Sequence, residues 1–132
     1  KYIIDYIDVY QREGQTEKAK KKTDRAMELI NADGTKWNHP EVLKRKALIC
    51  MAETQSNSTE VESIFVESLE LARLQKSKLS ELSTATSLAR FWGEGQERQK
   101  AYDLLLPVYD WYTEGFETAH LKEAKELLSE LQ

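Results

Sequence analysis

The feature that most constrains this fold is a helical spacing of small and apolar residues that recurs three times. Each occurrence has three positions separated by four and then three residues, the period of one face of an α-helix. The sets are Ala19, Thr23 and Ala26; Val61, Phe65 and Ser68; and Ala101, Leu105 and Val108. Each set is preceded by a pair at a three-residue step: Ile7 and Tyr10, Ala47 and Cys50, and Ala89 and Trp92. The pattern predicts three helical hairpins, in which small residues let two helices approach closely.

The composition of the chain also favours an all-α fold. Of its 132 residues only 5 are Gly and 2 are Pro, too few for the many tight turns of a sheet-rich protein. At this length we expect one domain with its own core, spanning residues 1–132. We place the hairpins at about residues 1–31, 40–76 and 79–113, followed by a capping helix at about 119–131.

A helical hairpin of this kind cannot bury its apolar face alone, so neighbouring hairpins stack into a continuous core. We therefore expect a right-handed α-solenoid of about three hairpins that resemble tetratricopeptide (TPR) repeats. The hairpins recur at about 40 residues, whereas the tetratricopeptide unit has about 34; longer loops at 32–40 and 54–58 account for the difference. Armadillo-like or HEAT-like pairs have similar periods and stay open on period alone, but the alternation of small and large residues favours the tetratricopeptide repeat.

The last third of the chain carries a closer resemblance. The segments TSLARFW and AYDLLLPVYDWYTEGFETAHLKEAKELL resemble the C-terminal tetratricopeptide region of large bacterial signalling proteins. FVESLELARLQKSKLSELSTATSLAR is similar to the penultimate hairpin of that family. Its members have a class III adenylate or guanylate cyclase domain, or a DNA-binding domain, then a predicted ATPase domain and the repeats. The resemblance implies a regulatory or interaction region for signal transduction. The family's usual proline after each second helix is missing here.

The two ends of the chain differ in pattern. Residues 1–13 carry two adjoining apolar stripes, which a helix needs only when it packs against neighbours on two sides. Residues 119–131 carry a single stripe, as expected of a terminal capping helix. We therefore expect the chain to be the C-terminal fragment of a longer protein. The exposed N-terminal helix, through Tyr2, Ile3, Tyr6 and Ile7, could also pair with a second copy to form a homodimer.

No motif of catalysis, cofactor binding or metal binding is found in the sequence. Gly93-Glu94-Gly95 lacks the Lys and Ser or Thr of a phosphate-binding loop, so we interpret it as a turn between helices. His39, His120 and Cys50 lack the short paired spacing of a metal site, and Cys50 lies on an apolar helix face. We expect Trp92 and Trp111 in the core, while Trp37, in a loop, is more open to ligand stacking. We therefore predict that this fragment is not an enzyme and carries no cofactor, while a cyclase or ATPase domain upstream in the full-length protein stays open.

The charge and the cysteine count limit the partners and the compartment. A net charge of −4 argues against nucleic acid as a partner, because phosphate binding needs a basic face. No apolar run approaches the roughly 20 residues of a membrane span. A single cysteine excludes an internal disulfide and fits a reducing compartment, so we expect a cytoplasmic protein.

The leading functional hypothesis is a helical repeat module for protein–protein interaction or for contact with upstream domains of its own chain. In stacked hairpins the first helices line the concave side, where their outward residues meet a partner. The candidate partner-binding residues are Asp8, Gln11, Arg12, Lys44, Met51, Thr86 and Arg90. Their mixed charge suits an extended peptide or an acidic helix. The alternatives are a domain that senses a small ligand or peptide, and a free-standing adaptor or homodimerisation module.

Overall fold

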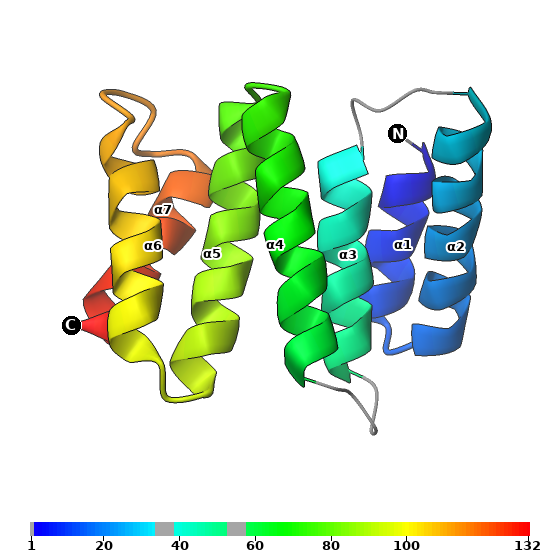
Figure 1. The fold of residues 1–132 in the computed structure, drawn as a ribbon, viewed down its shortest axis with the longest axis horizontal. Helices are drawn as coiled ribbons and strands as arrows, with labels where there is room; N and C mark the ends of the chain where they lie inside the picture. The colour runs from blue at the N-terminus through cyan, green and yellow to red at the C-terminus, as the bar shows by residue number, and fades with distance from the viewer. Residues whose placement is uncertain (1, 34–38, 53–57) are drawn as a thin grey trace. The chain divides into compact units, whose positions relative to one another are not determined.

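The computed structural model describes the backbone of residues 2–33, 39–52 and 58–132 and, within these, the side chains of 7–29, 39–51 and 58–132. In this described part the chain forms seven α-helices and no strand (Figure 1). The helices are α1 Tyr2–Arg12, α2 Thr16–Asp33, α3 His39–Ala52, α4 Ser58–Leu74, α5 Lys78–Glu94, α6 Arg98–Asp110 and α7 Ala119–Leu131. The predicted all-α class is confirmed.

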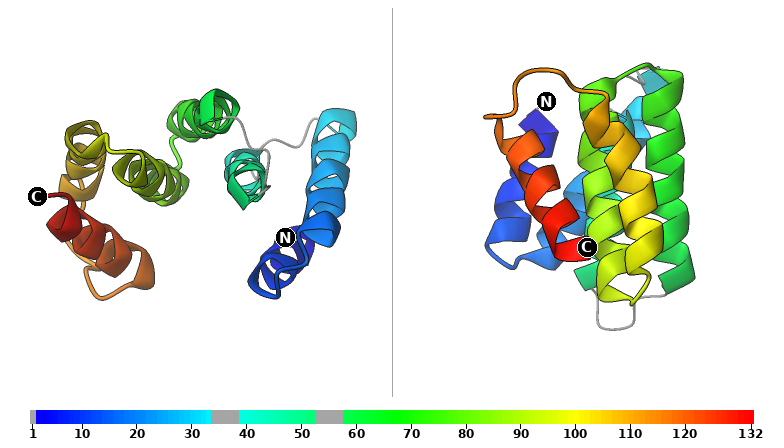
Figure 2. Two further views of the ribbon diagram at one scale, coloured as in Figure 1. Left: turned by 90° about the horizontal axis from the view of Figure 1, so that it is seen from below. Right: turned by 90° about the vertical axis from the view of Figure 1, so that its left-hand side faces the viewer.

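The chain divides into two compact units, Lys1–Leu71 and Ala72–Gln132. In the first unit, α1, α2 and α3 contact one another in all three pairings. In the second unit, α5, α6 and α7 do the same (Figure 2). Each unit therefore contains a helical hairpin, α1–α2 or α5–α6, and a further helix that packs against both members of that hairpin.

The positions singled out by the recurring spacing lie in the cores. All nine positions on the second helices α2, α4 and α6 are buried. On the first helices α1, α3 and α5, the leading residue of each pair is buried and the second is half-buried. In the first unit the Ser68 hydroxyl donates a hydrogen bond to the carbonyl of Pro40, at 2.6 Å, and so ties α4 to the start of α3. The small residues thus stand where helices meet.

The short turns between helices share one hydrogen-bond pattern. The amide of Gln15 donates to the Tyr10 carbonyl at 2.8 Å, and that of Glu97 donates to the Trp92 carbonyl at 2.8 Å. Each turn ends its helix with a residue in the left-handed conformation, Gly14 at φ 74° and Gln96 at φ 68°. This arrangement satisfies the last carbonyl groups of a helix and reverses the chain within a few residues. The same kind of turn follows α4, where Lys76 is the left-handed residue at φ 57°.

The two hairpins α1–α2 and α5–α6 correspond residue by residue at a fixed offset. Ala19 and Ala101, which are 82 positions apart, are both fully buried at the start of a second helix. The same offset relates two cation–π contacts: Lys18 lies 5.8 Å from the centre of the Tyr10 ring, and Lys100 lies 4.2 Å from that of Trp92. Backbone turn, small residue and cation–aromatic contact therefore recur together.

Two sequence expectations about the end of this region need correction. Gly93 belongs to α5 rather than to a turn, since α5 runs to Glu94 with Gly95 as its C-cap. A Cβ on Gly93 would meet Leu131 of α7 at 3.0 Å, so the glycine serves a close approach between these helices. Trp111 is exposed, not buried: it follows α6, which ends at Asp110, and the neighbouring Tyr112 is half-buried in its place.

Helix α7 has the predicted single apolar stripe. Its buried residues are Leu121, Ala124, Leu127, Leu128 and Leu131, and the other side chains of this helix are exposed. At the other end of the chain, the side chains of Tyr2, Ile3 and Tyr6 lie outside the described residues, as does Trp37. The expectations of a homodimer and of an open Trp37 therefore stay predictions.

Candidate partner-binding groove

Two of the predicted partner-binding residues of the first unit belong to a charged cluster that joins α1 to α3. Arg45 of α3 holds both carboxylate oxygens of Asp8, with Nε 2.7 Å from Oδ1 and Nη2 3.0 Å from Oδ2. Its Nη1 also donates to Glu41 Oε1 at 2.8 Å. Lys44 Nζ lies 3.6 Å from the same Glu41 oxygen. Asp8 and Lys44 are therefore engaged within the protein.

The electrostatics of this cluster follow from its partial burial. Burial lowers the pKa of Lys44 below its usual range, and this effect exceeds the opposing attraction of Glu41. For Arg45, burial is the largest effect and opposes the charge, but the hydrogen bonds to Asp8 and Glu41 and the attraction of their charges together outweigh it and raise the pKa above its usual range. A bidentate guanidinium–carboxylate pair of this kind is among the stronger contacts between charged side chains. The cluster therefore stabilises the packing of α1 on α3.

The other predicted partner-binding residues differ from one another in exposure and in the contacts that they make. Thr86 is buried and its hydroxyl donates to the Leu82 carbonyl at 2.8 Å, so the expectation that it faces a partner is wrong. Arg90 of α5 is partly exposed and pairs with Glu123 of α7 at 3.0 Å. Arg12 is exposed, while Gln11 and Met51 are half-buried.

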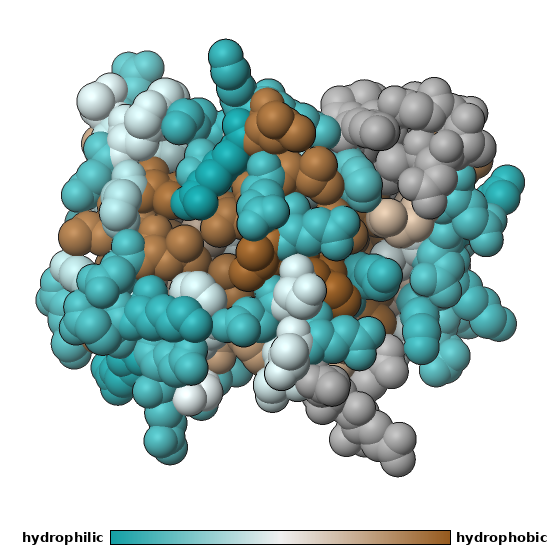
Figure 3. Space-filling view, viewed as in Figure 1, coloured by the Kyte–Doolittle hydropathy of each residue, from teal (hydrophilic) through white to brown (hydrophobic). Residues whose placement is uncertain are grey.

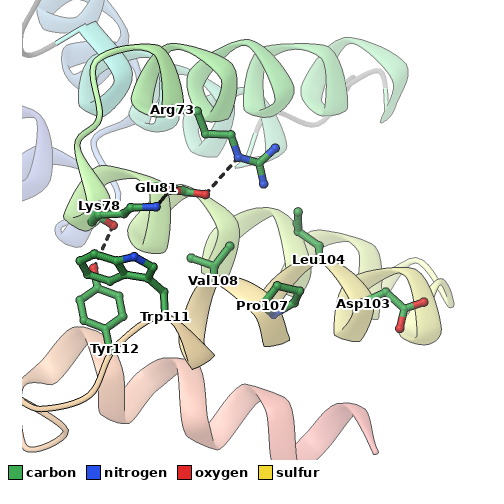
Figure 4. A pocket seen from close by; sticks show the side chains of 9 residues that line it. All are labelled: Arg73, Lys78, Glu81, Asp103, Leu104, Pro107, Val108, Trp111 and Tyr112. Carbon is green, nitrogen blue, oxygen red and sulfur yellow. Dashed lines mark hydrogen bonds and ion pairs between the residues drawn. The ribbon is translucent and has the colours of Figure 1, made fainter.

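A better candidate surface lies in the second unit, along α6. Leu104, Pro107 and Trp111 recur at steps of three and four residues and form a second apolar stripe beside the buried one. The stripe lines a groove of about 230 Å³ whose opposite wall is the start of α5 (Figure 4). Figure 3 shows hydrophobic residues gathered on this face beside α6. With a side chain that is 56% exposed, Trp111 is a large anchor at the end of the groove.

The rim of the groove carries two cations that share one carboxylate. Glu81 of α5 accepts from Arg73 Nε at 3.0 Å and lies 3.5 Å from Lys78 Nζ. The Glu81 side chain is only 11% exposed, whereas those of Arg73 and Lys78 are 50% and 45% exposed. The positive charge is therefore presented to solvent while the negative charge is withdrawn (Figure 4).

Contacts at the end of α6 hold the aromatic part of the groove in place. Lys78 Nζ lies 4.9 Å from the centre of the Trp111 ring, within the range of a cation–π contact. The Tyr112 hydroxyl donates to the Lys78 carbonyl at 2.9 Å. Burial, aided by the charge of Glu81, raises the pKa of Tyr112 above its usual range, so the hydroxyl keeps its proton. Trp111 and Tyr112 meet edge to face at 5.0 Å.

A second hollow, of about 220 Å³, is lined by residues of α5, the start of α6 and the end of α7. Its lining includes Arg90, Arg98 and Glu130. Arg90 is paired with Glu123, and Arg98 donates to the Glu130 carbonyl. These contacts tie α7 to the hairpin, and the hollow offers a partner no aromatic anchor. The groove along α6 is therefore the candidate site.

Sequence reasoning missed the groove, although its signal was present. Leu104, Pro107 and Trp111 each precede a position of the buried stripe by one residue, and Trp111 was expected on that stripe itself. A helix that carries two apolar stripes, of which one ends in tryptophan, indicates a second contact surface. The full lining of the groove was harder to find, because two of its members, Arg73 and Asp103, are 30 positions apart in the chain.

Within the described part of the chain, no group of three or more His, Cys, Asp or Glu side chains could hold a metal ion. None of the described helices is long and apolar enough to cross a membrane. Comparison of the chain with known protein families, curated proteins and solved structures found no match.

Proposed function

We propose that this protein is a non-catalytic helical repeat module that binds a segment of another protein, or of another domain of its own chain. The observation that carries the proposal is the groove along α6, where Leu104, Pro107 and Trp111 form an uncovered apolar stripe under a positive rim. Exposed tryptophan and arginine, which both line this groove, are typical of the residues that dominate binding energy at protein interfaces. The volume of about 230 Å³ is below the roughly 300–1,000 Å³ of small-molecule pockets, which favours a side-chain anchor.

We further propose that the hairpins are tetratricopeptide-like repeats stacked into a right-handed α-solenoid. The support is internal: hairpins α1–α2 and α5–α6 share buried positions, turn geometry and cation–aromatic contacts. In each unit, the hairpin packs against one further helix, α3 or α7, in the same pairings. A repeat that contacts its neighbour in one fixed way generates a solenoid when it is propagated.

The biological setting of the module is proposed from the resemblance of residues 65–128. That resemblance favours the cytoplasmic regulatory region of a bacterial signalling protein with a cyclase or ATPase domain. In such a protein, the groove would take a segment that changes the activity of the catalytic domain.

The proposal is tested by selecting binders from a random peptide library on the immobilised protein. We expect selected peptides whose dissociation constants, measured by calorimetry, rise about tenfold or more with Trp111→Ala, as for a residue that dominates an interface. The matched control is Val9→Ala, which removes another exposed apolar side chain, on α1 in the other unit. The proposal is wrong if no peptide is enriched, or if Trp111→Ala and Val9→Ala bind the selected peptides equally well.

A further inference from the structure

The two ends of the groove along α6 differ in charge. Lys78 lies at one end beside Trp111, and Arg73 lies above the middle of the groove (Figure 4). Both present their cationic groups to solvent, because their shared counter-ion Glu81 is nearly buried. The guanidinium of Arg73 and the ammonium of Lys78 can therefore donate hydrogen bonds to a partner that approaches from solvent. A carboxylate that approaches this end is attracted by two cations and meets only one withdrawn negative charge.

The opposite end of the groove carries acceptors. Asp103 of α6 is exposed, and its carboxylate receives a hydrogen bond from Gln99 Nε2 at 2.9 Å. Pro107 lies within α6 and has no amide hydrogen, so the Asp103 carbonyl loses the donor that an α-helix would supply. Carboxylate and carbonyl therefore make this end suited to a cation or to an N–H group.

Between these ends the groove is apolar and partly fixed in shape. Leu104 and Pro107 lie on its floor beside Asp103, and Trp111 lies at the cationic end under Lys78 (Figure 4). The cation–π contact and the ion pair with Glu81 hold Lys78 in position. Because the Lys78 ammonium is already held in place, it loses little conformational freedom when a carboxylate binds, which lowers the entropy cost of forming the contact.

We propose that the groove binds a protein segment in which an apolar side chain lies between an acidic residue and a basic residue. The apolar side chain packs on Leu104, Pro107 and Trp111, the acidic residue meets Lys78 and Arg73, and the basic residue meets Asp103. The inference rests on the proposed function and adds the chemistry of the occupant. The groove belongs to α6 and the ends of α4 and α5, so it differs from the first-helix surface expected from sequence.

Four acetylated and amidated peptides test the proposal: SSALLASS, DDALLASS, SSALLAKK and DDALLAKK. Binding to the whole protein is measured at low and at high salt by fluorescence anisotropy of labelled peptides. Each charged flank should tighten binding by about threefold or more at low salt, as expected of exposed ion pairs, and high salt should reduce the gain. The peptide with both flanks should bind most tightly.

Protein variants assign each gain to one end of the groove. Lys78→Gln should abolish the gain from the aspartates and leave the gain from the lysines, while Lys78→Arg should keep both. Asp103→Asn should remove only the gain from the lysines. Circular dichroism shows whether each variant keeps its helical content.

The outcomes separate the charge inference from the proposed function. If SSALLASS binds and loses affinity with Trp111→Ala, but the charged flanks add nothing, the groove is a docking site and the charge inference is wrong. The inference is also wrong if the aspartate gain survives Lys78→Gln. If none of the four peptides binds while library-selected peptides bind through Trp111, the inference fails and the proposed function stands.

Discussion

Asp8 and Arg90 occupy equivalent positions in the two hairpins, and each forms an ion pair with the helix that follows its hairpin. Asp8 of α1 pairs with Arg45 of α3 at 2.7 Å, and Arg90 of α5 pairs with Glu123 of α7 at 3.0 Å. The signs of the charges are exchanged between the two pairs, while the pair of helices that they join is equivalent. The position immediately after the buried residue of the first helix is therefore used to hold the next helix.

The two ion pairs should differ in their contribution to stability. Arg45 is 14% exposed and bonded in a bidentate manner, so Asp8→Ala should lower the free energy of unfolding by about 1–2 kcal/mol. Arg90→Ala should cost about 0.5 kcal/mol or less, because neither partner of that pair is buried, at 42% and 49% exposed. Urea unfolding followed by circular dichroism measures both, with Arg12→Ala as an exposed control. Equal losses of unfolding free energy for Asp8→Ala and Arg90→Ala would contradict the stronger contribution assigned to the Asp8–Arg45 pair.

Lys44 should make the stability of the protein rise with pH at alkaline values. Burial lowers its pKa in the folded state below the ordinary value of 10.5. The folded state therefore releases the Lys44 proton first, and between the two pKa values the unfolded state binds more protons. Lys44→Met should be more stable than the wild type at neutral pH. This advantage should shrink as the pH rises through the folded-state pKa toward 10.5.

The measurement for Lys44 is the difference in melting temperature between wild type and variant across this pH range. Lys46→Met, which removes an exposed lysine from the same helix, is the matched control and should show no such trend. A constant difference for Lys44→Met would contradict the burial of its ammonium group.

The left-handed residues that end the helices should respond to substitution according to residue type. Gln96 has φ 68° and bears a side chain, so Gln96→Gly should stabilise the protein by about 0.5–1 kcal/mol. Gly14→Ala places a side chain at φ 74° and should destabilise by about 1 kcal/mol. Because nothing lies within 4 Å of a Cβ at Gly14, any loss there reports backbone conformation and not a clash. The thermal midpoints of both variants should move in opposite directions.

Substitutions on the two apolar stripes of α6 should have different effects on stability: a change on the buried stripe should destabilise the protein strongly, and a change on the exposed stripe should not. Leu105 is fully buried, so Leu105→Ala should lower the free energy of unfolding by about 2–5 kcal/mol. Trp111→Ala removes a larger side chain, but from the surface, and should cost about 1 kcal/mol or less. Calorimetric melting of the two variants gives the comparison. A large loss for Trp111→Ala would mean that this ring packs in the core.

The sequence predicted the helices and their buried faces well because both depend on local periodicity. The buried residues Ala19, Ala47, Ala89 and Ala101 follow from spacing alone. The charged contacts could not be predicted in the same way, since Asp8 and Arg45 are 37 positions apart and meet only when α1 packs on α3. Thr86 was misplaced because a polar side chain on a helix can bond to its own backbone and be buried.

The most direct test of the account is chemical-shift mapping of the ¹⁵N-labelled protein with a library-selected peptide. We predict that the amide signals of α6 and of the start of α5, together with the indole N–H of Trp111, shift on titration and saturate together. Signals of Arg12 and Met51, on the surface expected from sequence, should stay in place. Shifts confined to α1 and α3, with the Trp111 indole unchanged, would contradict the account.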